Sequence, residues 1–441
     1  MKAAIRRFVP RAALSRYHRS LAELATRWYG HPSRQLVVIG VTGTSGKTTV
    51  SLLLHRMLEQ AGNPTAVATT ALFVVRDRQT MNDRKMTMLG RFGLQRWLRR
   101  AVRAGCTHVI VETTSEGIAQ HRHRGIDYDL VVLTNLSPEH IESHGSFAAY
   151  QAAKEKLFHG LTLTYRKRGV PKTMVVNADD EASSMFLRHA ADRYLTFSMQ
   201  GKTVAAAEAV LATKIKLSAT GSSFLLSHGG EQTRVELQLL GRMNVENCLA
   251  AAAAAVALGV PLEVIAEAVA GVTGVPGRLE FMAAGGVTAI VDYAFHAKAM
   301  EELYAVVDQL PHRRVIHVLG ATGGGRDRAR RPVLGRIAGE RADDVVVTNE
   351  DPYDEDPLHI MDEVLVGVLE ISSKHLNENV FRIFDRAQAI AKAVSLASAG
   401  DIVLVTGKGS EQAIVVAGGR KVPWDDREAV RLALAQRFST T

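Results

Sequence analysis

Short apolar runs alternate with stretches of helical periodicity along most of the 441-residue chain. The runs are nearly continuous in Val, Ile and Leu, which is typical of strands buried on both faces of a parallel sheet. They predict strands at Leu36–Val41, His108–Glu112, Leu130–Thr134, Met174–Asn177, Ala289–Tyr293, Val315–Leu319, Val345–Thr348 and Ile402–Thr406. Helices are predicted between several of them, at Thr48–Ala61, Phe92–Ala104, Phe147–His159, Val245–Leu258 and Arg386–Ala397. This alternation predicts an α/β fold.

Two interruptions divide this pattern. Between Lys202 and Leu240, polar and apolar residues alternate around glycines, which predicts antiparallel hairpins. Near Gly274–Gly277 glycine and proline interrupt the pattern again, and a second series of strands and helices follows. We therefore predict a central nucleotide-binding domain over residues 37–276, with a mostly parallel sheet and the hairpins. A smaller Rossmann-like domain over residues 277–441 follows it.

The first 36 residues form a basic extension with apolar spacing compatible with a helix from Ala12 to Gly30. A helix docked on the central domain is favoured over one lying on a membrane surface. No apolar run reaches the roughly 18 residues of a membrane helix, and no secretion signal is apparent. We therefore expect a cytoplasmic protein without a membrane span.

The net charge of +9 changes this picture little, because nucleotides satisfy it as well as nucleic acid does. Hydrophobic residues make up 46% and charged residues 22% of the chain, as in ordinary globular proteins. We expect small-molecule substrates, no nucleic acid partner and a monomer.

The stretch "VIGVTGTSGKTTV", residues 38–50, is a candidate phosphate-binding loop. The common form has a glycine, four residues and then Gly-Lys-Ser/Thr, whereas here Val41 takes the place of the first glycine. Backbone amides at a helix start face phosphates, a lysine adds a point charge, and a threonine can bind Mg²⁺. The stretch predicts a nucleotide site made of Gly43, Thr44, Ser45, Gly46, Lys47, Thr48 and Thr49. The alternative is a glycine turn without a ligand.

Three further residues are candidates for a metal site. Glu112 and His140 follow predicted strands, at the carboxyl ends where ligands gather in open α/β sheets. Lys154 lies on the apolar side of the helix that Ser146 caps, four residues after Tyr150. Such a lysine usually extends to the edge of the face. A buried lysine is easier to discharge, and its neutral amine can take up CO₂ as a metal-binding carbamate.

The sequence resembles the Mur ligases, ATP-dependent enzymes that add amino acids to UDP-N-acetylmuramoyl peptides, and most closely the branch that adds the third residue. The resemblance extends from about Leu36 to Leu434. The segments that carry it, in the order of the family, are GVTGTSGKTT, VETTSEGIAQHR, TNLSPEHIESHG, YQAAKEKLF, NADDE, GRMNVENCLAA, GVPGRLE, VDYA, GGGRDRARRP and TGKGSEQ.

The resemblance implies a reaction in which ATP phosphorylates a peptide carboxylate and an amino acid's amine then displaces the phosphate. It implies one Mg²⁺ at Thr48 and Glu112, and a second at His140, with Lys154 carbamylated to N6-carboxylysine. The implied catalytic residues are Lys47, Lys154, His140 and Arg278. Asn244, Arg278 and Asp292 would complete the ATP site. Thr114, Ser115 and Arg122 would bind the acceptor, and the incoming amino acid would meet Glu350, Asp351, Tyr353, Gly407 and Glu411.

Four departures from the family pattern bear on the substrates. The family has a UDP-binding domain of about 100 residues ahead of the loop, and about 40 residues precede it here. This leaves open whether the acceptor carries UDP. The Asp-Asn-Pro-Arg motif of diaminopimelate-adding members becomes Glu350-Asp351-Pro352-Tyr353, without the arginine. Because Glu350, Asp351 and Asp354 make this region acidic, a lysine-like amino acid is predicted instead. Ser410 replaces a family histidine, and His296 is shifted by one position, so it is assigned no role.

Three alternative functions remain open. A folylpolyglutamate-synthetase-like ligase would share the two-domain core, but its loop has Gly-Lys-Gly. An amidating Mur-like subunit would carry zinc cysteines, whereas this chain has only Cys106 and Cys248. A catalytically inert P-loop scaffold is disfavoured by the presence of Lys47, Glu112, His140 and Lys154 together.

Overall fold

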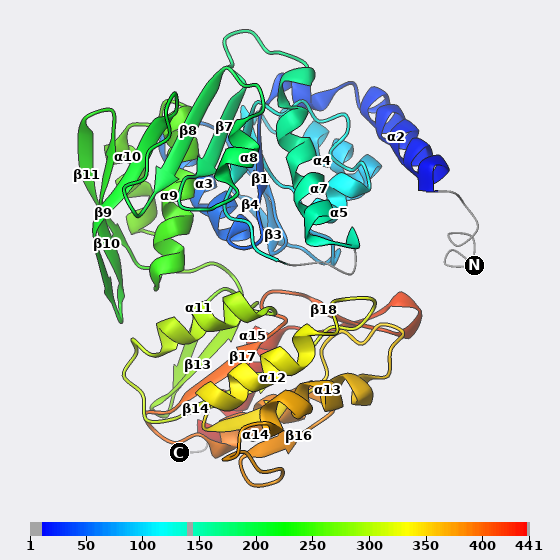
Figure 1. Ribbon diagram of the computed structural model, residues 1–441, viewed down its shortest axis with the longest axis vertical. Coiled ribbons are helices and arrows are strands. Elements are labelled where there is room, and N and C mark those ends of the chain that lie inside the picture. Colours follow the sequence, from blue (N-terminus) through cyan, green and yellow to red (C-terminus); the bar gives the residue numbers. More distant parts are fainter. Residues whose placement is uncertain (1–10, 139–143, 439–441) are drawn as a thin grey trace.

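The computed structural model describes residues 11–138 and 144–438. Two α/β units follow one another along the chain and are stacked in Figure 1, each around its own sheet. The first sheet ends at Leu237 and the second begins at Glu280, so the boundary predicted at residue 276 falls between the two sheets. His140 lies outside the described residues.

The first unit is an 11-stranded sheet with the predicted phosphate loop after its central strand. Strand β1 (Val37–Thr42) lies between β5 (His108–Glu112) and β6 (Leu130–Leu133), and both pairings are parallel. Val41 is opposite Glu112 in this register, so the ends of β1 and β5 bring the loop and the Glu112 carboxylate to the same edge. The sheet order is β11-β10-β9-β8-β7-β6-β1-β5-β2-β3-β4.

The parallel centre of this sheet is bordered by antiparallel strands. The parallel part also includes β2 (Thr65–Ala68), β7 (Thr173–Asn177) and β8 (Arg193–Ser198). One border consists of β3 (Leu72–Val75) and β4 (Arg78–Met81). The other is formed by β9 (Glu208–Ser218), β10 (Gly221–His228) and β11 (Glu231–Leu237). The hairpins predicted between Lys202 and Leu240 are confirmed, although β9 joins β8 in a parallel pairing.

Helices cover both faces of the first sheet. One core cluster contains α3 (Lys47–Gln60), α9 (Arg242–Ala257) and α10 (Leu262–Ala270), and the other contains α4 (Arg91–Arg103), α7 (Phe147–His159) and α8 (Ser183–Leu187). The alanines of the 250–255 segment are fully buried, and their small side chains let α9 pack closely against α3. The helix α5 (Ser115–Ala119) follows β5 at the edge that carries the site.

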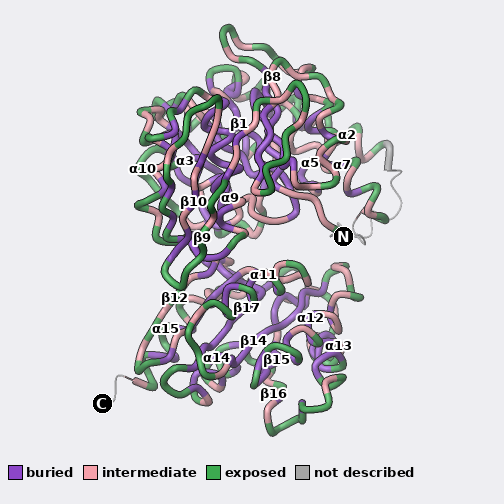
Figure 2. The backbone as a smooth tube through the Cα atoms, turned by 60° about the vertical axis from the view of Figure 1, so that its left-hand side comes forward, coloured by how far each residue is buried: buried purple, intermediate pink, exposed green. Residues whose placement is uncertain are grey.

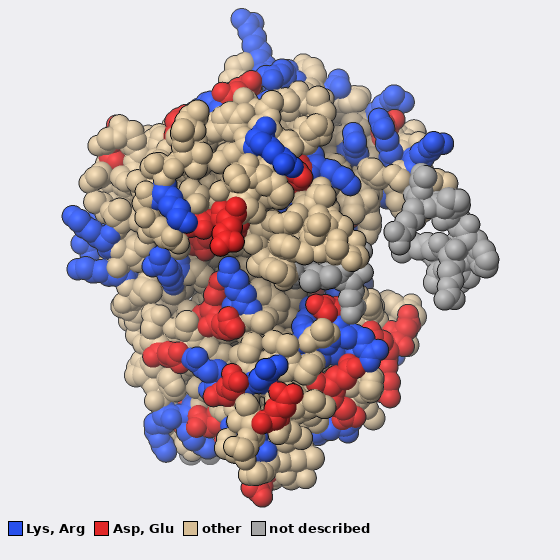
Figure 3. All heavy atoms as spheres, in the orientation of Figure 1, with Lys and Arg blue, Asp and Glu red and all other residues tan. Residues whose placement is uncertain are grey.

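The N-terminal extension forms the helix α2 (Arg11–Trp28) and a 3₁₀ turn, η1 (Pro32–Gln35). Helix α2 packs on α4 with Ala22 and Ala25 buried, and the Thr26 hydroxyl donates to the carbonyl of Ala22 at 2.8 Å. Lys and Arg side chains gather at this corner of the molecule, at the upper right of Figure 3. Among the described residues, no helix combines the length and the apolar character required to cross a bilayer.

The second unit is a six-stranded sheet in the order β12-β13-β17-β14-β15-β16. Its strands are β12 (Glu280–Ala284), β13 (Val287–Asp292), β14 (Val315–Leu319), β15 (Asp344–Val347), β16 (Val380–Arg382) and β17 (Ile402–Thr406). Only β12 is antiparallel to its neighbour. The helices are α11 (Ala297–Val307), α12 (Arg330–Arg341), α13 (Pro357–Leu369), α14 (Arg386–Leu396) and α15 (Asp426–Phe438). A 3₁₀ turn, η3 (Ala417–Gly419), connects the two strands of the hairpin β18 (Ala413–Val416) and β19 (Arg420–Pro423), and η2 (Leu161–Leu163) is a further 3₁₀ turn in the first unit.

The fold therefore confirms the predicted α/β class. Every predicted strand and helix is present, and the ends differ by at most three residues. Figure 2 shows the buried backbone concentrated in the two sheets, with exposed segments around each. The apolar runs were sufficient for this because both faces of each parallel sheet are covered by helices.

Candidate active site

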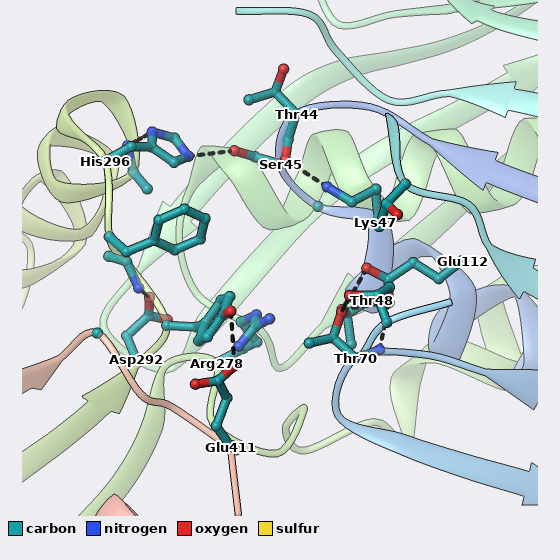
Figure 4. Close-up of a pocket in the computed structure, with 18 of the residues that line it drawn as sticks. Thr44, Ser45, Lys47, Thr48, Thr70, Glu112, Arg278, Asp292, His296 and Glu411 are labelled. Atoms are coloured by element: carbon teal, nitrogen blue, oxygen red, sulfur yellow. Dashed lines mark hydrogen bonds between the residues drawn. The ribbon is translucent and has the colours of Figure 1, made fainter. Parts of the chain in front are cut away.

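A cavity of about 290 Å³ lies between the two units and collects most of the residues predicted to be functional. The first unit contributes the loop after β1, the segment between β4 and α4, the end of β5 and the start of α9. The second unit contributes the segments after β13, β14, β15 and β17. Figure 4 shows these side chains facing one another across the cavity.

The loop between β1 and α3 needs glycine at two positions because other parts of the first unit approach it closely. Gly43 has a φ of 152°, and a Cβ there would lie 1.9 Å from the Thr134 hydroxyl oxygen. Gly46 has a φ of 79°, and a Cβ there would lie 2.0 Å from Asn247 Oδ1. The common first glycine is dispensable because Val41 is an ordinary buried residue of β1. The backbone amides at the start of α3 thus remain available to phosphates.

Lys47 bends back over this loop. Its ammonium donates to the carbonyl of Gly43 at 3.0 Å and to the carbonyl of Thr44 at 2.7 Å. Across the cavity, His296 Nε2 lies 3.2 Å from Ser45 Oγ, and His296 Nδ1 accepts from the Ala299 amide at the start of α11. The shifted histidine, which the sequence left without a role, therefore joins the second unit to the phosphate loop.

Glu112 lies beside Thr48 at the base of the loop. The Thr48 hydroxyl donates to Glu112 Oε2 at 2.9 Å, and the Thr70 amide donates to the same oxygen at 2.8 Å. The Thr70 hydroxyl donates to Oε1 at 3.0 Å. A buried carboxylate with an adjacent hydroxyl fits Mg²⁺, which usually takes one or two carboxylates together with substrate phosphates. Sequence analysis missed Thr70, although its position just after β2 follows the same strand-end rule.

Lys154 is buried against the phosphate loop, with 1% of its surface exposed. Its ammonium donates to the carbonyl of Gly43 at 2.7 Å and lies 4.6 Å from the centre of the Tyr150 ring. The Tyr150 hydroxyl is 3.0 Å from the Thr44 hydroxyl. The general tendency of such a lysine to extend to the edge of its helix face does not apply here. Within the described ranges, no three His, Cys, Asp or Glu side chains form a metal-binding group, and His140 is not in those ranges.

The predicted ATP residues beyond the loop line the same cavity. The Arg278 guanidinium lies 4.3 Å from the centre of the Tyr293 ring. The amides of Leu279 and Ala294 donate to the Asp292 carboxylate at 2.8 and 2.7 Å. Burial raises the pKa of Asp292, and Arg278 opposes that rise.

Asn244 lines the cavity from the start of α9. Its side-chain amide donates to the carbonyl of Leu240 at 2.8 Å, and Asn247 donates to its oxygen at 3.2 Å. These two bonds hold the amide plane in one orientation beside the phosphate loop.

The three residues predicted to bind the acceptor lie together after β5. Thr114 caps α5 by accepting from the Gly117 amide at 3.1 Å, and the Ser115 hydroxyl lies 3.1 Å from His144 Nε2. Arg122 donates to the Met88 carbonyl at 2.7 Å. All three line the cavity, beside the phosphate loop and opposite the second unit.

The predicted amino-acid residues also line the cavity, on its opposite wall. Glu350 accepts from the Thr322 hydroxyl at 2.5 Å. Gly407 has a φ of 105°, and a Cβ there would lie 2.4 Å from Glu350 Oε2, so glycine is required for this approach. Asp351 and Glu411 lie beside them, and Tyr353 adopts a left-handed φ of 53°.

Asp351 and Glu411 are bridged by two lysines. Lys408 donates to Asp351 Oδ1 and to Glu411 Oε2, both at 2.8 Å. Lys85, from the segment between β4 and α4 of the first unit, donates to Asp351 Oδ2 at 2.7 Å and also to Glu411 Oε2. Burial by itself raises the pKa of both carboxyls, but the two ammoniums outweigh it and hold both pKa values below their usual range.

The negative charge of Asp351, which contributed to the prediction of a lysine-like substrate, is therefore already neutralised. Sequence analysis missed Lys85 because no motif surrounds it and its partners are 266 and 326 residues away. We call the residues Gly43–Thr49, Thr70 and Glu112 the phosphate end of the cavity. We call Lys85, Asp351, Lys408 and Glu411 its amine end.

The fold is that of a two-unit protein with a P-loop. The second unit forms the other side of the cavity at that loop. Family models agree: the Mur ligase middle domain matches residues 41–255, and the Mur ligase, glutamate ligase domain matches residues 277–409. The UDP-N-acetylmuramyl-tripeptide synthetase of Roseiflexus sp. (strain RS-1) is 39% identical over 95% of this chain and 82% of its own length. The UDP-N-acetylmuramoyl-L-alanyl-D-glutamate--2,6-diaminopimelate ligase of Geobacillus kaustophilus (strain HTA426) is 37% identical over 97% and 85%.

Solved structures show the same relationship. A structure of UDP-N-acetylmuramoyl-L-alanyl-D-glutamate--2,6-diaminopimelate ligase has a TM-score of 0.60 and 30% identity, covering 91% of this chain and 79% of its own. A Mycobacterium tuberculosis folylpolyglutamate synthase has a TM-score of 0.71 at 17% identity, over 89% and 92%, which shows a shared fold. The chain belongs to the Mur ligase family. It is thus a ligase that forms carbon–nitrogen bonds, in a family whose members depend on ATP and use Mg²⁺.

Proposed function

We propose that this ligase adds an amino acid to the carboxylate of a muramoyl-peptide-type cell-wall precursor and converts ATP to ADP and phosphate. The observation that carries the proposal is the cavity in which the phosphate end, Arg278 and Glu411 of the amine end face one another. Such an arrangement would hold a phosphoryl donor and an amine nucleophile on either side of one carboxylate. The names of the relatives support the choice of acceptor.

The reaction we propose has two steps. An acceptor carboxylate oxygen attacks the γ-phosphorus of ATP, the bond to the β-phosphate oxygen breaks, ADP leaves, and the acceptor becomes an acyl phosphate. The amine nitrogen then attacks the acyl carbon, the bond to the phosphate oxygen breaks, and the nitrogen loses a proton as the amide forms. Each step needs positioning and charge neutralisation more than covalent participation by the protein.

We assign phosphate, nucleoside, acceptor and metal binding to different residues of the cavity. Loop amides and Lys47 bind the phosphates, and Arg278 approaches them from the second unit. Asn244 and Asp292 are proposed to orient the nucleoside, and Thr114, Ser115 and Arg122 to hold the acceptor. Thr48 and Glu112 would hold Mg²⁺, which supplies further neutralisation of phosphate charge when bound.

The most direct test is phosphate release from purified protein against a matrix of acceptors and amino acids. The acceptors are muramoyl dipeptide with and without UDP, and a folate mono-glutamate. We expect release only with a muramoyl acceptor, an amino acid and Mg-ATP together. Release with the folate acceptor would favour the alternative of a folylpolyglutamate-synthetase-like ligase, and no release with any combination would favour a non-catalytic scaffold.

We further propose that Lys154 acts as a carbamate, N6-carboxylysine, with His140 at a second Mg²⁺ site. The burial of Lys154 against the phosphate loop supports this proposal, together with the family resemblance. We expect Lys154→Ala to lower turnover by about 10- to 100-fold, the usual effect of losing a group that supports a metal site. Small carboxylates such as acetate should restore part of the activity, and mass spectrometry at neutral pH should detect the added CO₂. Unchanged turnover in Lys154→Ala would remove the residue from the mechanism.

A further inference from the structure

Lys85 extends from the first unit into the amine end of the cavity. It lies between β4 and α4, has a left-handed φ of 54°, and only 7% of its side chain is exposed. Its ammonium contacts one carboxylate oxygen of Asp351 and one of Glu411. From β19 of the second unit, Lys421 donates to the carbonyls of Asp83 and Arg84 in the same segment. The second unit therefore holds this segment through the Lys85 side chain and through the two residues that precede it.

The charges at the amine end cancel. Asp351 and Glu411 contribute two negative charges, and Lys85 and Lys408 contribute two positive charges. All four side chains are largely buried, so an additional ammonium would lose its water without gaining Asp351 or Glu411 as an unpaired partner. Lys408 comes from the same segment as Glu411 and belongs to the local structure of the second unit. Lys85 is the member that comes from the other unit.

The position of Lys85 resembles that of a bound substrate side chain. Its ammonium reaches the two carboxylates from across the cavity, at the end of a flexible chain of four methylenes. Asp351 and Glu411 both belong to the amine end, where we propose that the incoming amino acid binds. A diamine substrate would present the same chemical group to the same two oxygens. Lys85 and such a substrate therefore compete for one place.

We infer that Lys85 takes the place of a cationic substrate side chain, and that the site selects an incoming amino acid whose side chain carries no positive charge. This inference rests on the proposed function, because it assumes that the amine end receives the incoming amino acid. Lysine, ornithine and the second ammonium of diaminopimelate would find both carboxylates occupied. A short, uncharged side chain requires no such partner and leaves Lys85 in place.

Replacement of Lys85 tests this directly. Lys85→Ala leaves two carboxylates with one ammonium and opens the volume of a lysine side chain. A lysine or ornithine substrate can then supply the missing charge. Lys85→Arg keeps the positive charge as a matched control. Lys421→Ala is a second control, because it removes two hydrogen bonds between the units without changing the contacts of Asp351 or Glu411.

The experiment compares kcat/KM for glycine, alanine, serine, lysine, ornithine and diaminopimelate in the wild type and these three variants. We expect kcat/KM of the wild type to be at least about tenfold higher for an uncharged amino acid than for lysine, since burying an unpaired charge costs free energy. In Lys85→Ala the ratio should shift by at least about tenfold toward the cationic amino acids. Lys85→Arg and Lys421→Ala should keep the wild-type preference. A wild type that prefers lysine or diaminopimelate, or an unchanged ratio in Lys85→Ala, overturns the inference.

A second measurement does not depend on turnover. Lysine at millimolar concentration should raise the thermal midpoint of Lys85→Ala and leave that of the wild type unchanged, since a ligand stabilises only the state that binds it. Lys85→Gln replaces Lys85→Ala if the latter fails to fold. Stabilisation of the wild type by lysine, or of neither protein, counts against the inference. Absence of phosphate release with every amino acid, by contrast, counts against the proposed function, so the two failures are distinguishable.

Discussion

The two ends of the cavity are built in different ways. The phosphate end belongs to the first unit alone, and most of it is the short loop between β1 and α3. Its contact between Thr48 and Glu112 joins the start of α3, which follows β1, to the end of β5, the parallel neighbour of β1. The amine end combines three segments from both units, and Lys85 and Glu411 are 326 residues apart in the chain. The first is a local structure, and the second depends on how the units meet.

This difference indicates how the site assembles. The contacts that position the glycines, Lys47 and Glu112 of the phosphate end lie within the first unit. The second unit contributes two carboxylates and one lysine to the amine end. Lys85 of the first unit contributes the second positive charge, which makes the four residues neutral together. We therefore expect nucleotide binding to tolerate an open cleft, whereas amino-acid selection requires a closed one.

The largest expected effect is at the phosphate end. Lys47→Ala removes the point charge beside the phosphates, and turnover should fall on the order of 10³-fold. The contacts at the amine end do not involve Lys47, so the residual activity should keep the wild-type order of amino acids. Steady-state phosphate release measures the first quantity and amino-acid competition the second. A loss of less than about tenfold would contradict the assigned role.

A smaller effect is expected for the metal contact. Glu112→Gln keeps the bonds from Thr48 and Thr70 possible but removes the charge, so the Mg²⁺ concentration for half-maximal activity should rise by about 10- to 100-fold. Chelation of Mg²⁺ should abolish activity in both proteins. Glu116→Gln is the matched control, because Glu116 lines the same cavity but contacts Arg326 at 3.7 Å. Equal Mg²⁺ dependence in the two variants would contradict a metal site at Glu112.

The smallest expected effect is a pH dependence at the amine end. The lysines hold the pKa values of Asp351 and Glu411 below their ordinary values of 3.8 and 4.5. Carboxyls with lowered pKa stabilise the closed form at neutral pH, and this contribution is lost as the pH falls through their values in the folded protein. The cleft should therefore open below about pH 4, as an increase in the radius of gyration measured by X-ray scattering.

Lys85→Met is the control for this acid transition, because it lacks the ion pairs of Lys85 with Asp351 and Glu411. We expect it to be more open than the wild type already at pH 7 and to change less on acidification. A variant with the same radius as the wild type at every pH would show that these ion pairs do not hold the cleft closed.

Much of the fold was predictable because its signals are local. The apolar run at Val315–Leu319 has the same bounds as β14. Ser146 is the N-cap of α7, as predicted, and its hydroxyl accepts from the Ala149 amide at 3.1 Å. Lys154 shows the limit of such signals. Its helix face was clear, but whether the side chain reaches water depends on Tyr150 and on the loop that carries Gly43.

The same limit applies to the charges near Asp351. Three acidic residues within five positions favoured a basic substrate. Asp354 in fact accepts from the Gly418 amide, and Asp351 is paired with two lysines. A carboxylate's effect on a ligand depends on every charge around it, and those charges come from distant parts of the chain.

The sequence by itself determined the α/β class, the order of the predicted strands and helices, and the residues of the phosphate end other than Thr70. These depend on periodicity, glycine and contacts between neighbouring elements, which short segments encode. Only the tertiary structure decided that Lys154 is buried, that His296 reaches Ser45, and that Lys85 neutralises Asp351 and Glu411. Burial and electrostatic pairing depend on the folded environment. Residues hundreds of positions apart in the chain therefore determine each other's charge state and pKa.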